Sequence, residues 1–313
     1  MVHKNKDGMK FLIAGGTGFI GTYLADYLAE HGHKVLQLTR SLKKAKSSRH
    51  TLYWDGENVP DNLQPDVIIN LCGLNISDKR WSKTTKKELI DSRVIPTRGI
   101  VSFIKQYDKK KPILINSSAI GFYPSCTDVQ TEHTDEPSQP LFSKYLVEQW
   151  EAEARDALQY QTIVVCLRFG VVLGTNGGML KKLFPSYRWG LGVILGDSSK
   201  FLSWVHIEDL CRAVLYVISI DKKQPVYNIT SPIPCTKRDF SEMLASVCKK
   251  PCFLSFPEYI VRFLFGEMGQ ELLLSDQQII PQHLLEAGFE FKYETIQAAL
   301  EQLLENNKNN MGR

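Results

Sequence analysis

The sequence lacks any long hydrophobic run, and none of its apolar stretches approaches the roughly 18 to 20 residues that a membrane-spanning helix needs. Its first residues, MVHKNKDG, are polar and have no apolar core behind them, which indicates neither a secretory signal nor an anchor. We therefore expect no membrane partner. We also expect residues 1–8 to be a disordered extension before a domain that begins near Met9.

Paired cysteines are also missing. The chain has seven cysteines, an odd number, none of them in a Cys-x-x-Cys pair, and most lie inside apolar runs such as IINLCGL and IVVCLRF. This pattern is typical of buried thiols in a reducing compartment, so we expect a cytoplasmic protein without disulfides. The cysteines offer no zinc site, no other metal-ligand spacing stands out, and we expect no bound metal.

The chain has no strong excess of charge of either sign. Its formal net charge is +4 and the positive residues are dispersed, which gives no reason to expect a nucleic-acid partner. Apolar residues make up 43% and charged residues 23% of the chain, as in globular proteins. A length of 313 residues is enough for one large α/β unit or for two domains.

Short apolar runs alternate with helix-length segments along the chain. We predict strands at residues 10–14, 33–40, 66–73, 112–119 and 162–174, and helices at residues 22–31, 83–107 and 143–159. Apolar strands that alternate with helices predict a parallel sheet covered by helices on both faces. The predicted fold class is α/β, a doubly wound parallel sheet with a smaller C-terminal lobe.

The domain boundaries are placed where the composition changes, because the sequence becomes glycine-rich and its apolar pattern becomes irregular in its second half. We expect residues 9–175 to form the dinucleotide-binding domain, to which a helix and a strand near 200–230 return. Residues 176–199 and 231–305 should form the substrate lobe. The end of the chain, residues 306–313, is rich in Asn and Lys and should be disordered.

A glycine-rich loop, GGTGFIG, lies between the first predicted strand and the first helix. Gly15, Gly18 and Gly21 stand where a dinucleotide fold needs a tight turn, close approach to a pyrophosphate and close helix packing. The N-terminus of the helix adds free N–H groups and the positive end of its dipole. A plain turn is the alternative, but the flanking strand and helix favour dinucleotide binding.

The second strand ends without the acidic residue that an NAD site uses to bind the ribose hydroxyls. Arg40 stands there instead, and no acidic residue occurs between Glu30 and Asp55. The same stretch carries further basic residues, Lys43, Lys44, Lys46 and Arg49. Because a guanidinium binds a phosphate and a carboxylate would repel one, the sequence predicts NADP(H) rather than NAD, with a solvated basic loop as the alternative.

Four motifs, GGTGFIG, NLCG, SSAIGFY and WVHIEDL, together resemble the extended short-chain dehydrogenase/reductase superfamily. Within it, RWSKTTKKELIDSRV, WEAEA and the C-terminal run FGEMGQELLLSDQQIIPQHLLEAGFEFKYETIQAAL resemble an atypical epimerase-family subgroup, labelled nucleoside-diphosphate-sugar epimerase or cell-division-inhibitor-like. The resemblance covers the chain from Met9 to about Leu304. It implies an NAD(P)-binding Rossmann domain followed by a small C-terminal domain.

The resemblance also implies which residues hold the dinucleotide. The pyrophosphate would lie against Gly15, Thr17, Gly18, Phe19, Ile20 and Gly21. The adenosine 2′-phosphate would lie against Arg40 and Ser41, and the adenine near Trp54 and Asp55. The nicotinamide side would be lined by Cys72, Gly73 and Ser117.

Candidate catalytic residues follow the fourth predicted strand. In the superfamily a serine or threonine there hydrogen-bonds the substrate oxygen, and Ser118 fits that register better than Ser117, although both are also compatible with a plain strand end. Tyr123, in GFYP, either presents a phenol to the cleft or packs under the proline. His206 stands at a predicted helix start with Asp209 nearby, and we take both as structural.

The superfamily's Tyr-x-x-x-Lys pair is absent from PLFSKYLVEQW. Lys144 and Tyr145 are neighbours, which point about 100° apart on a helix and cannot reproduce the one-face arrangement of residues i and i+4. Four residues before them stand Pro140 and Leu141, which donate no proton. Two registers stay open: FSK resembles the usual Ser-Lys, whereas LVEQWE places Tyr145 where the lysine would be.

The sequence therefore favours an NADP(H)-binding oxidoreductase or epimerase-like enzyme that acts on a small carbonyl or hydroxyl substrate. Catalysis would depend on Ser118, with Tyr123 or Tyr145 supplying a phenol, and would be slow for ordinary carbonyl compounds because the usual pair is missing. The alternative is a non-catalytic NADP(H)-binding protein with a structural or redox-sensing role. Whether two copies of the chain form a homodimer stays an open question.

Overall fold

The computed structural model describes residues 8–107, 110–134, 140–252 and 254–311. Its centre is a seven-stranded parallel sheet in the order β12-β7-β5-β4-β1-β2-β3. The strands are β1 (Lys10–Ala14), β2 (Lys34–Thr39), β3 (Thr51–Tyr53), β4 (Val67–Asn70), β5 (Ile113–Ala119), β7 (Val164–Phe169) and β12 (Val226–Ile229). All five predicted runs contribute a strand, and the α/β Rossmann fold class is confirmed.

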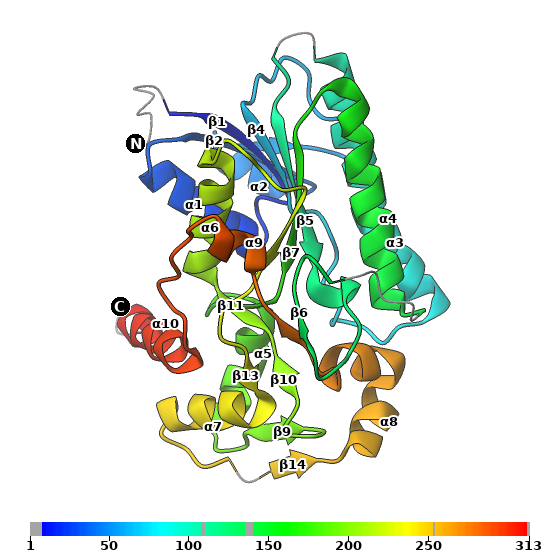
Figure 1. Cartoon of the computed structure of the whole chain (residues 1–313). Coiled ribbons are helices and arrows are strands. Elements are labelled where there is room, and N and C mark those ends of the chain that lie inside the picture. The colour runs from blue at the N-terminus through cyan, green and yellow to red at the C-terminus, as the bar shows by residue number, and fades with distance from the viewer. Residues whose placement is uncertain (1–7, 108–109, 135–139, 253, 312–313) are drawn as a thin grey trace.

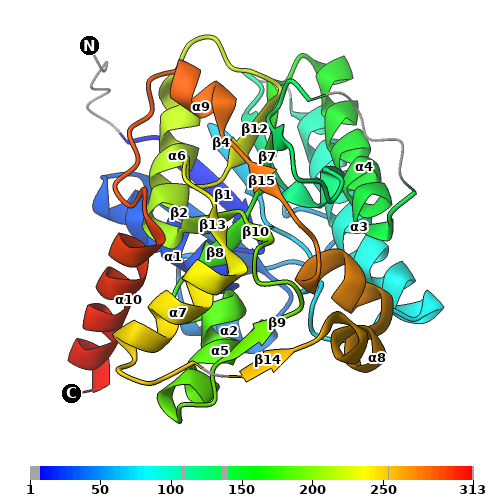
Figure 2. The ribbon, with the colours of Figure 1, turned by 60° about the horizontal axis from the view of Figure 1, so that its bottom comes forward.

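Helices cover both faces of this sheet (Figures 1 and 2). Because successive side chains of a strand point to opposite faces, Phe11 and Ile13 pack on one side, and Leu12 and Ala14 on the other. The first side is covered by α1 (Phe19–Glu30) and α6 (Ile207–Ser219), and the second by α3 (Lys83–Gln106) and α4 (Phe142–Arg155).

The strand order reverses next to β1. The chain passes from β1 through α1 to β2 on one side, and later enters β4 on the other side of β1. The loops that follow β1 and β4 therefore diverge, and ligands of such folds bind in the crevice outside the carboxyl ends of these strands. The backbone N–H of Leu71 donates to Ala14 O at 2.9 Å and ties the two loops together at their base.

Helices α5 (Gly178–Arg188), α7 (Lys237–Val247) and α10 (Ile296–Met311) lie beyond one end of the sheet (Figure 1), and a second cluster of buried side chains joins them. The cluster includes residues such as Leu180, Phe184, Leu244 and Leu300. We take it as the core of the substrate lobe, a division that stays a prediction.

Shorter elements complete the fold. The strands are β6 (Val129–Gln130), β8 (Val171–Leu173), β9 (Val193–Leu195), β10 (Phe201–Leu202), β11 (Trp204–His206), β13 (Cys235–Thr236), β14 (Leu254–Phe256) and β15 (Gln278–Ile279). The helices are α2 (Leu42–Ser47), α8 (Glu258–Met268) and α9 (Gln282–Glu286), with helical turns η1 (Ile120–Phe122), η2 (Asp156–Tyr160) and η3 (Gly269–Leu273).

Both ends of the chain bear on the sequence predictions. Helix α10 continues to Met311, so the part of the tail that the structure describes is helical where disorder was predicted. Residues 1–7, which belong to the predicted N-terminal extension, and residues 312–313 lie outside the described residues. Within the described part of the chain, no helix combines the length and the apolar character that crossing a bilayer requires.

Candidate functional site

The glycine-rich loop lies at the crevice, and its glycines differ in what surrounds them. A Cβ on Gly15, whose φ is +73°, would lie 2.7 Å from Leu71 O, and a Cβ on Gly21 would lie 2.5 Å from Gly15 O. These two positions need glycine for the packing of the protein itself. A Cβ on Gly18 would meet only Gly15 O, at 3.3 Å. The free space in front of Gly18 is what a close-lying pyrophosphate requires.

Helix α1 starts at this loop with Gly18 as its N-cap and with no acidic residue in its first turn. None of the described side chains caps it, so its first N–H groups are available to an anion. The Phe19 ring does not lie toward that anion: Cβ atoms on Gly174 and Gly177 would come within 2.6 and 2.3 Å of it. Phe19 can thus offer its backbone, rather than its side chain, to a phosphate.

Basic side chains gather beside the loop, at the end of β2. Ser41 caps α2 by accepting a hydrogen bond from Lys44 N at 3.3 Å, and Lys44 Nζ donates to Thr17 O at 2.9 Å. Arg40 is exposed, and its Cδ lies 3.8 Å from the position of a Cβ on Gly56. The positive charge of Lys44 therefore lies next to the glycine-rich loop, and Arg40 directly follows β2, where the sequence predicts the 2′-phosphate.

The side chains of Trp54 and Asp55 are both engaged in contacts within the protein. The Trp54 indole is 2% exposed and belongs to the core formed with Ile100, so it cannot stack on a base. The Asp55 carboxylate accepts from the backbone N–H groups of Glu57 and Asn58, at 2.7 and 2.8 Å. These hydrogen bonds lower the pKa of Asp55, with the bond from Asn58 as the first cause. Both side chains serve the local fold, and the position of these two residues near the adenine stays a prediction.

The loop after β4 is built on a buried amide. The Asn70 side chain donates to Thr97 Oγ1 and to Asn116 Oδ1, at 2.8 and 2.7 Å, and accepts from Cys72 N at 3.1 Å. Ser117 Oγ donates to Asn70 O at 2.7 Å. Desolvation raises the pKa of the Cys72 thiol to about 12, so this residue is a protonated lining group rather than a thiolate nucleophile.

Arg93 lies directly under this loop and was not predicted. A Cβ on Gly73 would lie 2.9 Å from Arg93 Cζ, and the guanidinium donates to Leu89 O and Leu74 O, both at 3.0 Å. It also lies over the Trp150 ring, 5.1 Å from the centroid. Burial lowers the pKa of Arg93 to about 10, because no described carboxylate pairs with it to offset the desolvation. The crevice therefore has a positive charge beneath its β4 side.

Ser118 is not open to a substrate. It is 3% exposed, and its Oγ donates to Glu151 Oε1 at 2.6 Å. Glu151 also binds Arg168, with Nε and Nη2 at 2.9 and 3.0 Å, and Arg155 Nη2 at 2.7 Å. Burial alone would raise the pKa of Glu151, but the hydrogen bonds and charge of Arg168 hold it below its ordinary value.

Tyr123 belongs to the same buried network. It is 1% exposed, accepts from Arg168 Nη1 at 3.2 Å and donates to Asn228 Oδ1 at 3.0 Å. Of the two alternatives for this residue, the packed one is therefore observed. The catalytic assignments of Ser118 and Tyr123 stay predictions, although both side chains are enclosed and hydrogen-bonded to internal partners.

Helix α4 carries Lys144 and Tyr145 on different faces. Tyr145 is 49% exposed and shares the solvent-facing stripe with Gln149 and Ala152, while Lys144 Nζ forms an ion pair with Glu148 at 3.1 Å. The face toward the protein interior carries Phe142, Ser143, Leu146 and Val147. Among the contacts described, neither Lys144 nor Tyr145 reaches Ser118, and these two neighbours do not form a Tyr-Lys pair on one face of the helix.

His206 has a structural role, as the sequence predicts. Its Nδ1 accepts from Glu208 N at 3.1 Å and caps α6, and its Nε2 lies 3.0 Å from Gln302 Oε1. Because an N–H donates to Nδ1, the proton of the neutral ring is on Nε2. Burial lowers the pKa of His206 to about 4. Asp209 accepts from Tyr293 N at 2.8 Å and joins this helix start to the C-terminal segment.

Comparison with known proteins identifies the family. Residues 11–230 match the NAD dependent epimerase/dehydratase family, and residues 256–303 match a domain of unknown function, DUF1731. The chain belongs to the NAD dependent epimerase/dehydratase family.

Relatives of this epimerase/dehydratase chain are similar over nearly its whole length. An epimerase family protein of Mycobacterium bovis is 36% identical over 292 residues, which cover 92% of this chain and 95% of the relative. An epimerase family protein of Staphylococcus epidermidis is 34% identical over 302 residues, which cover 94% of this chain and 99% of the relative. The crystal structure of the human epimerase family protein SDR39U1 with NADPH has 29% identity and a TM-score of 0.86, covering 95% of this chain and 100% of that chain.

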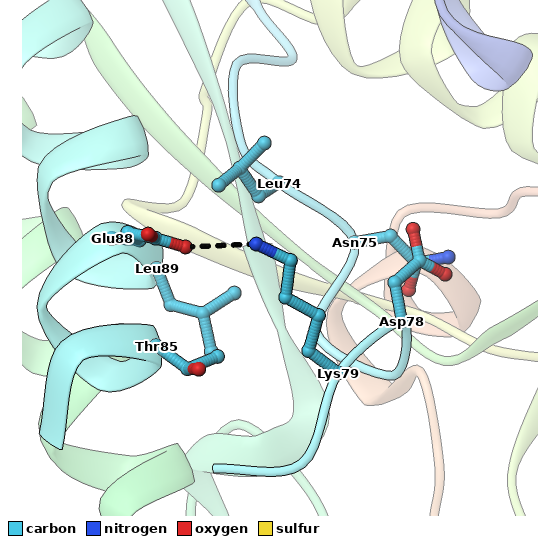
Figure 3. Close-up of a pocket in the computed structure, with 7 residues that line it drawn as sticks. All are labelled: Leu74, Asn75, Asp78, Lys79, Thr85, Glu88 and Leu89. Carbon is cyan, nitrogen blue, oxygen red and sulfur yellow. Dashed lines mark hydrogen bonds and ion pairs between the residues drawn. The ribbon is translucent and has the colours of Figure 1, made fainter. Parts of the chain in front are cut away.

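Two hollows of this family member lie at different places in the fold. A cavity of about 90 Å³ lies between the loop after β4 and the start of α3, and Lys79 reaches across it to Glu88 at 3.2 Å (Figure 3). It is far smaller than a dinucleotide requires. A larger, open hollow of about 610 Å³ lies along α5, and its lining includes the cations Lys181, Arg188 and Lys250. Such a lining favours an anionic group.

Proposed function

We propose that the chain binds NADP(H) in the crevice between the carboxyl ends of β1 and β4. The observation that carries this proposal is the cationic end of β2, where Lys44 bonds to the glycine-rich loop, Arg40 directly follows the strand, and no carboxylate takes the place of the NAD-binding acid. The human relative, whose structure contains NADPH, supports the same choice.

In this proposal each part of the site has a separate task. The backbone at Gly18 admits the pyrophosphate, and the N-terminus of α1 stabilises its charge. Arg40 and Ser41 bind the 2′-phosphate, the guanidinium through charge-assisted hydrogen bonds. Cys72 and Ser117 lie on the nicotinamide side, at the ends of β4 and β5. NADPH, when bound, supplies a hydride.

We propose further that the protein is an oxidoreductase or epimerase-like enzyme for a small carbonyl or hydroxyl compound, and that it works in the cytoplasm. Turnover of ordinary carbonyl substrates is slow, because Ser118 and Tyr123 are enclosed and α4 supplies no Tyr-Lys pair. A positioned proton donor contributes on the order of 10² to 10⁴ in rate, and that contribution is missing here.

The second candidate is a non-catalytic NADP(H)-binding protein. It is favoured by the same enclosed network, in which Glu151 and Arg168 engage the two groups that would otherwise polarise a substrate. In that case the dinucleotide acts as a structural or redox-sensing ligand. The two candidates share the cofactor site and differ only in chemistry at the nicotinamide.

NADPH oxidation against a broad panel of carbonyl compounds, with nucleotide binding measured in parallel, tests both candidates. The enzyme proposal predicts slow turnover, and Arg40→Asp should weaken NADPH binding and raise the NADPH concentration that turnover requires. Tight NADPH binding without even a single turnover supports the non-catalytic protein. Fast turnover that Ser118→Ala, Tyr123→Phe and Tyr145→Phe all leave unchanged would mean that an unrecognised proton donor serves the site, and it would contradict the predicted slow chemistry.

A further inference from the structure

Two segments far apart in the sequence meet beside the outer sheet edge, away from the crevice. Strands β6 and β15 pair in parallel, with Val129 opposite Gln278, so the chain leaves both strands in the same direction. The turn after β6 therefore lies beside α9. Glu132 fixes this contact, because its carboxylate accepts from Asn228 N at 2.7 Å and from Gln282 N at 3.0 Å.

Three side chains with metal-binding atoms converge at this contact. His133 comes from the turn, His283 and Glu286 come from α9, and their ligand atoms all lie within 4.8 Å of one another. His133 Nε2 lies 3.8 Å from Glu286 Oε1. The two imidazoles are in edge contact, with centroids 4.7 Å apart and planes at 86°. His283 and Glu286 are three residues apart on one helix and so share a face.

The hydrogen bonds around the cluster leave its ligand atoms ready for a cation. His283 Nδ1 lies 2.8 Å from Val226 O, and since a carbonyl only accepts, the ring proton is on Nδ1. The lone pair of the neutral ring is therefore on Nε2. Gln282 Nε2 donates to Glu286 Oε1 at 2.8 Å and orients the carboxylate. Outer hydrogen bonds of this kind orient the ligands of protein metal sites.

We propose that His133, His283 and Glu286 bind a divalent transition-metal ion of the zinc class. Two imidazoles and one carboxylate suit such an ion, whereas Mg²⁺ and Ca²⁺ prefer oxygen ligands. At metal–ligand distances of about 2.1 Å, the ligand atoms of a tetrahedral site lie roughly 3.4 Å apart. His133 and Glu286 are exposed and can make that small approach, and a water completes the coordination.

Zinc bound here would join the turn after β6 to α9. Because the separate segments of an unfolded chain do not form such a site, the ion stabilises the folded state by mass action. The site lies apart from the glycine-rich loop, so its occupation does not depend on the proposed dinucleotide. The sequence shows no signal for it, since the turn and the helix meet only through the β6–β15 pairing.

The test is a Zn²⁺ titration of metal-stripped full-length protein without a histidine tag, followed by calorimetry. We expect one equivalent to bind with a Kd of about 10 µM or tighter. His133→Ala should weaken that binding at least about tenfold, a loss typical of removing one ligand or its support. His50→Ala, which removes another exposed histidine, should bind as the unaltered protein does. Visible absorption of a Co²⁺ complex separates imidazole ligation from binding to the cysteines.

Thermal unfolding supplies a second readout. In chelator, His133→Ala should melt as the unaltered protein does, because the side chain is exposed. With Zn²⁺ added, the unaltered protein and His50→Ala should gain melting temperature, and His133→Ala and Glu286→Gln should not. The proposal is overturned if no stoichiometric binding occurs, or if His133→Ala and Glu286→Gln bind Zn²⁺ as tightly as the unaltered protein.

Discussion

At the scale of single residues, Gly18 differs from Gly21 although both belong to the same loop. The backbone at Gly18 is extended, with φ −81° and ψ −177°, a conformation that a β-branched residue adopts without strain. A Cβ on Gly21 would instead lie 2.5 Å from Gly15 O and 2.6 Å from Gly16 Cα. The fold itself therefore requires glycine at position 21, and the proposed ligand requires it at position 18.

We predict that Gly18→Val abolishes NADPH binding and lowers the melting temperature only slightly, because the added Cβ meets Gly15 O alone, at 3.3 Å, and the rest of the side chain fills the space of the pyrophosphate. Gly21→Val, the matched variant, should lower the melting temperature strongly because its side chain collides with backbone. Fluorescence titration and thermal melts measure the two effects. Normal NADPH affinity in folded Gly18→Val would show that the loop has been misassigned.

Glu151 and Glu153 offer a second comparison within one helix. Glu151 is 1% exposed and bound to Arg168, whereas Glu153 pairs with Arg98, whose side chain is 63% exposed. Removing one charge of a buried pair leaves the other unpaired, so Glu151→Gln should cost about 3 to 5 kcal/mol of unfolding free energy. Glu153→Gln should cost about 1 kcal/mol or less. Urea denaturation measures both, and equal costs would contradict the structural role of the network.

At the scale of elements, the cap of α6 predicts a pH dependence. The pKa of His206 is about 4 in the folded protein and 6.5 for an ordinary histidine, so the unfolded state binds the proton more tightly. The contribution of neutral His206 to the unfolding free energy is therefore fully present above pH 6.5. It is lost as the pH drops toward 4, and the loss is about 3 kcal/mol at most. His206→Asn keeps a capping side chain that does not titrate, and its unfolding free energy should fall less over this interval. Identical pH profiles of the two proteins would argue against a buried, neutral His206.

Helix α4 shows what sequence periodicity can and cannot predict about the surroundings of a helix. Its apolar stripe, which includes Phe142, Leu146 and Trp150, predicts the buried face, and all three side chains are buried. The pattern does not say what lies against that face. Glu151 is charged and sits in WEAEA, where it looks solvated, and only the fold brings it to Arg168 from β7. Ser118 donates to the same carboxylate, so a long-range ion pair that the sequence does not reveal decides the environment of the predicted catalytic serine.

For the whole molecule, the parallel sheet was predictable because its strands are apolar runs set between helices. Strand β3 was not predictable from the sequence, because its three residues follow a polar stretch and form only the edge of the sheet. The contacts that the C-terminal segment makes with the rest of the fold could not be predicted from the sequence either. Glu271, for example, accepts from the backbone N–H groups of Phe142 and Ser143 at 3.1 and 2.9 Å, and so caps α4 from the far end of the chain. No local pattern encodes such a contact.

The cofactor-binding role, by contrast, depends on features that are local in sequence, namely the glycine-rich loop and the basic stretch after β2. The ratio of the dissociation constants for NADH and NADPH, measured by titration under one set of conditions, tests that role most directly. A charge-assisted contact of about 1.5 to 3 kcal/mol with the 2′-phosphate predicts that NADPH binds roughly 10- to 150-fold more tightly. Arg40→Asp should erase or reverse this preference, and Arg49→Ala should keep it. Equal affinities for NADPH and NADH in the unaltered protein would contradict the account.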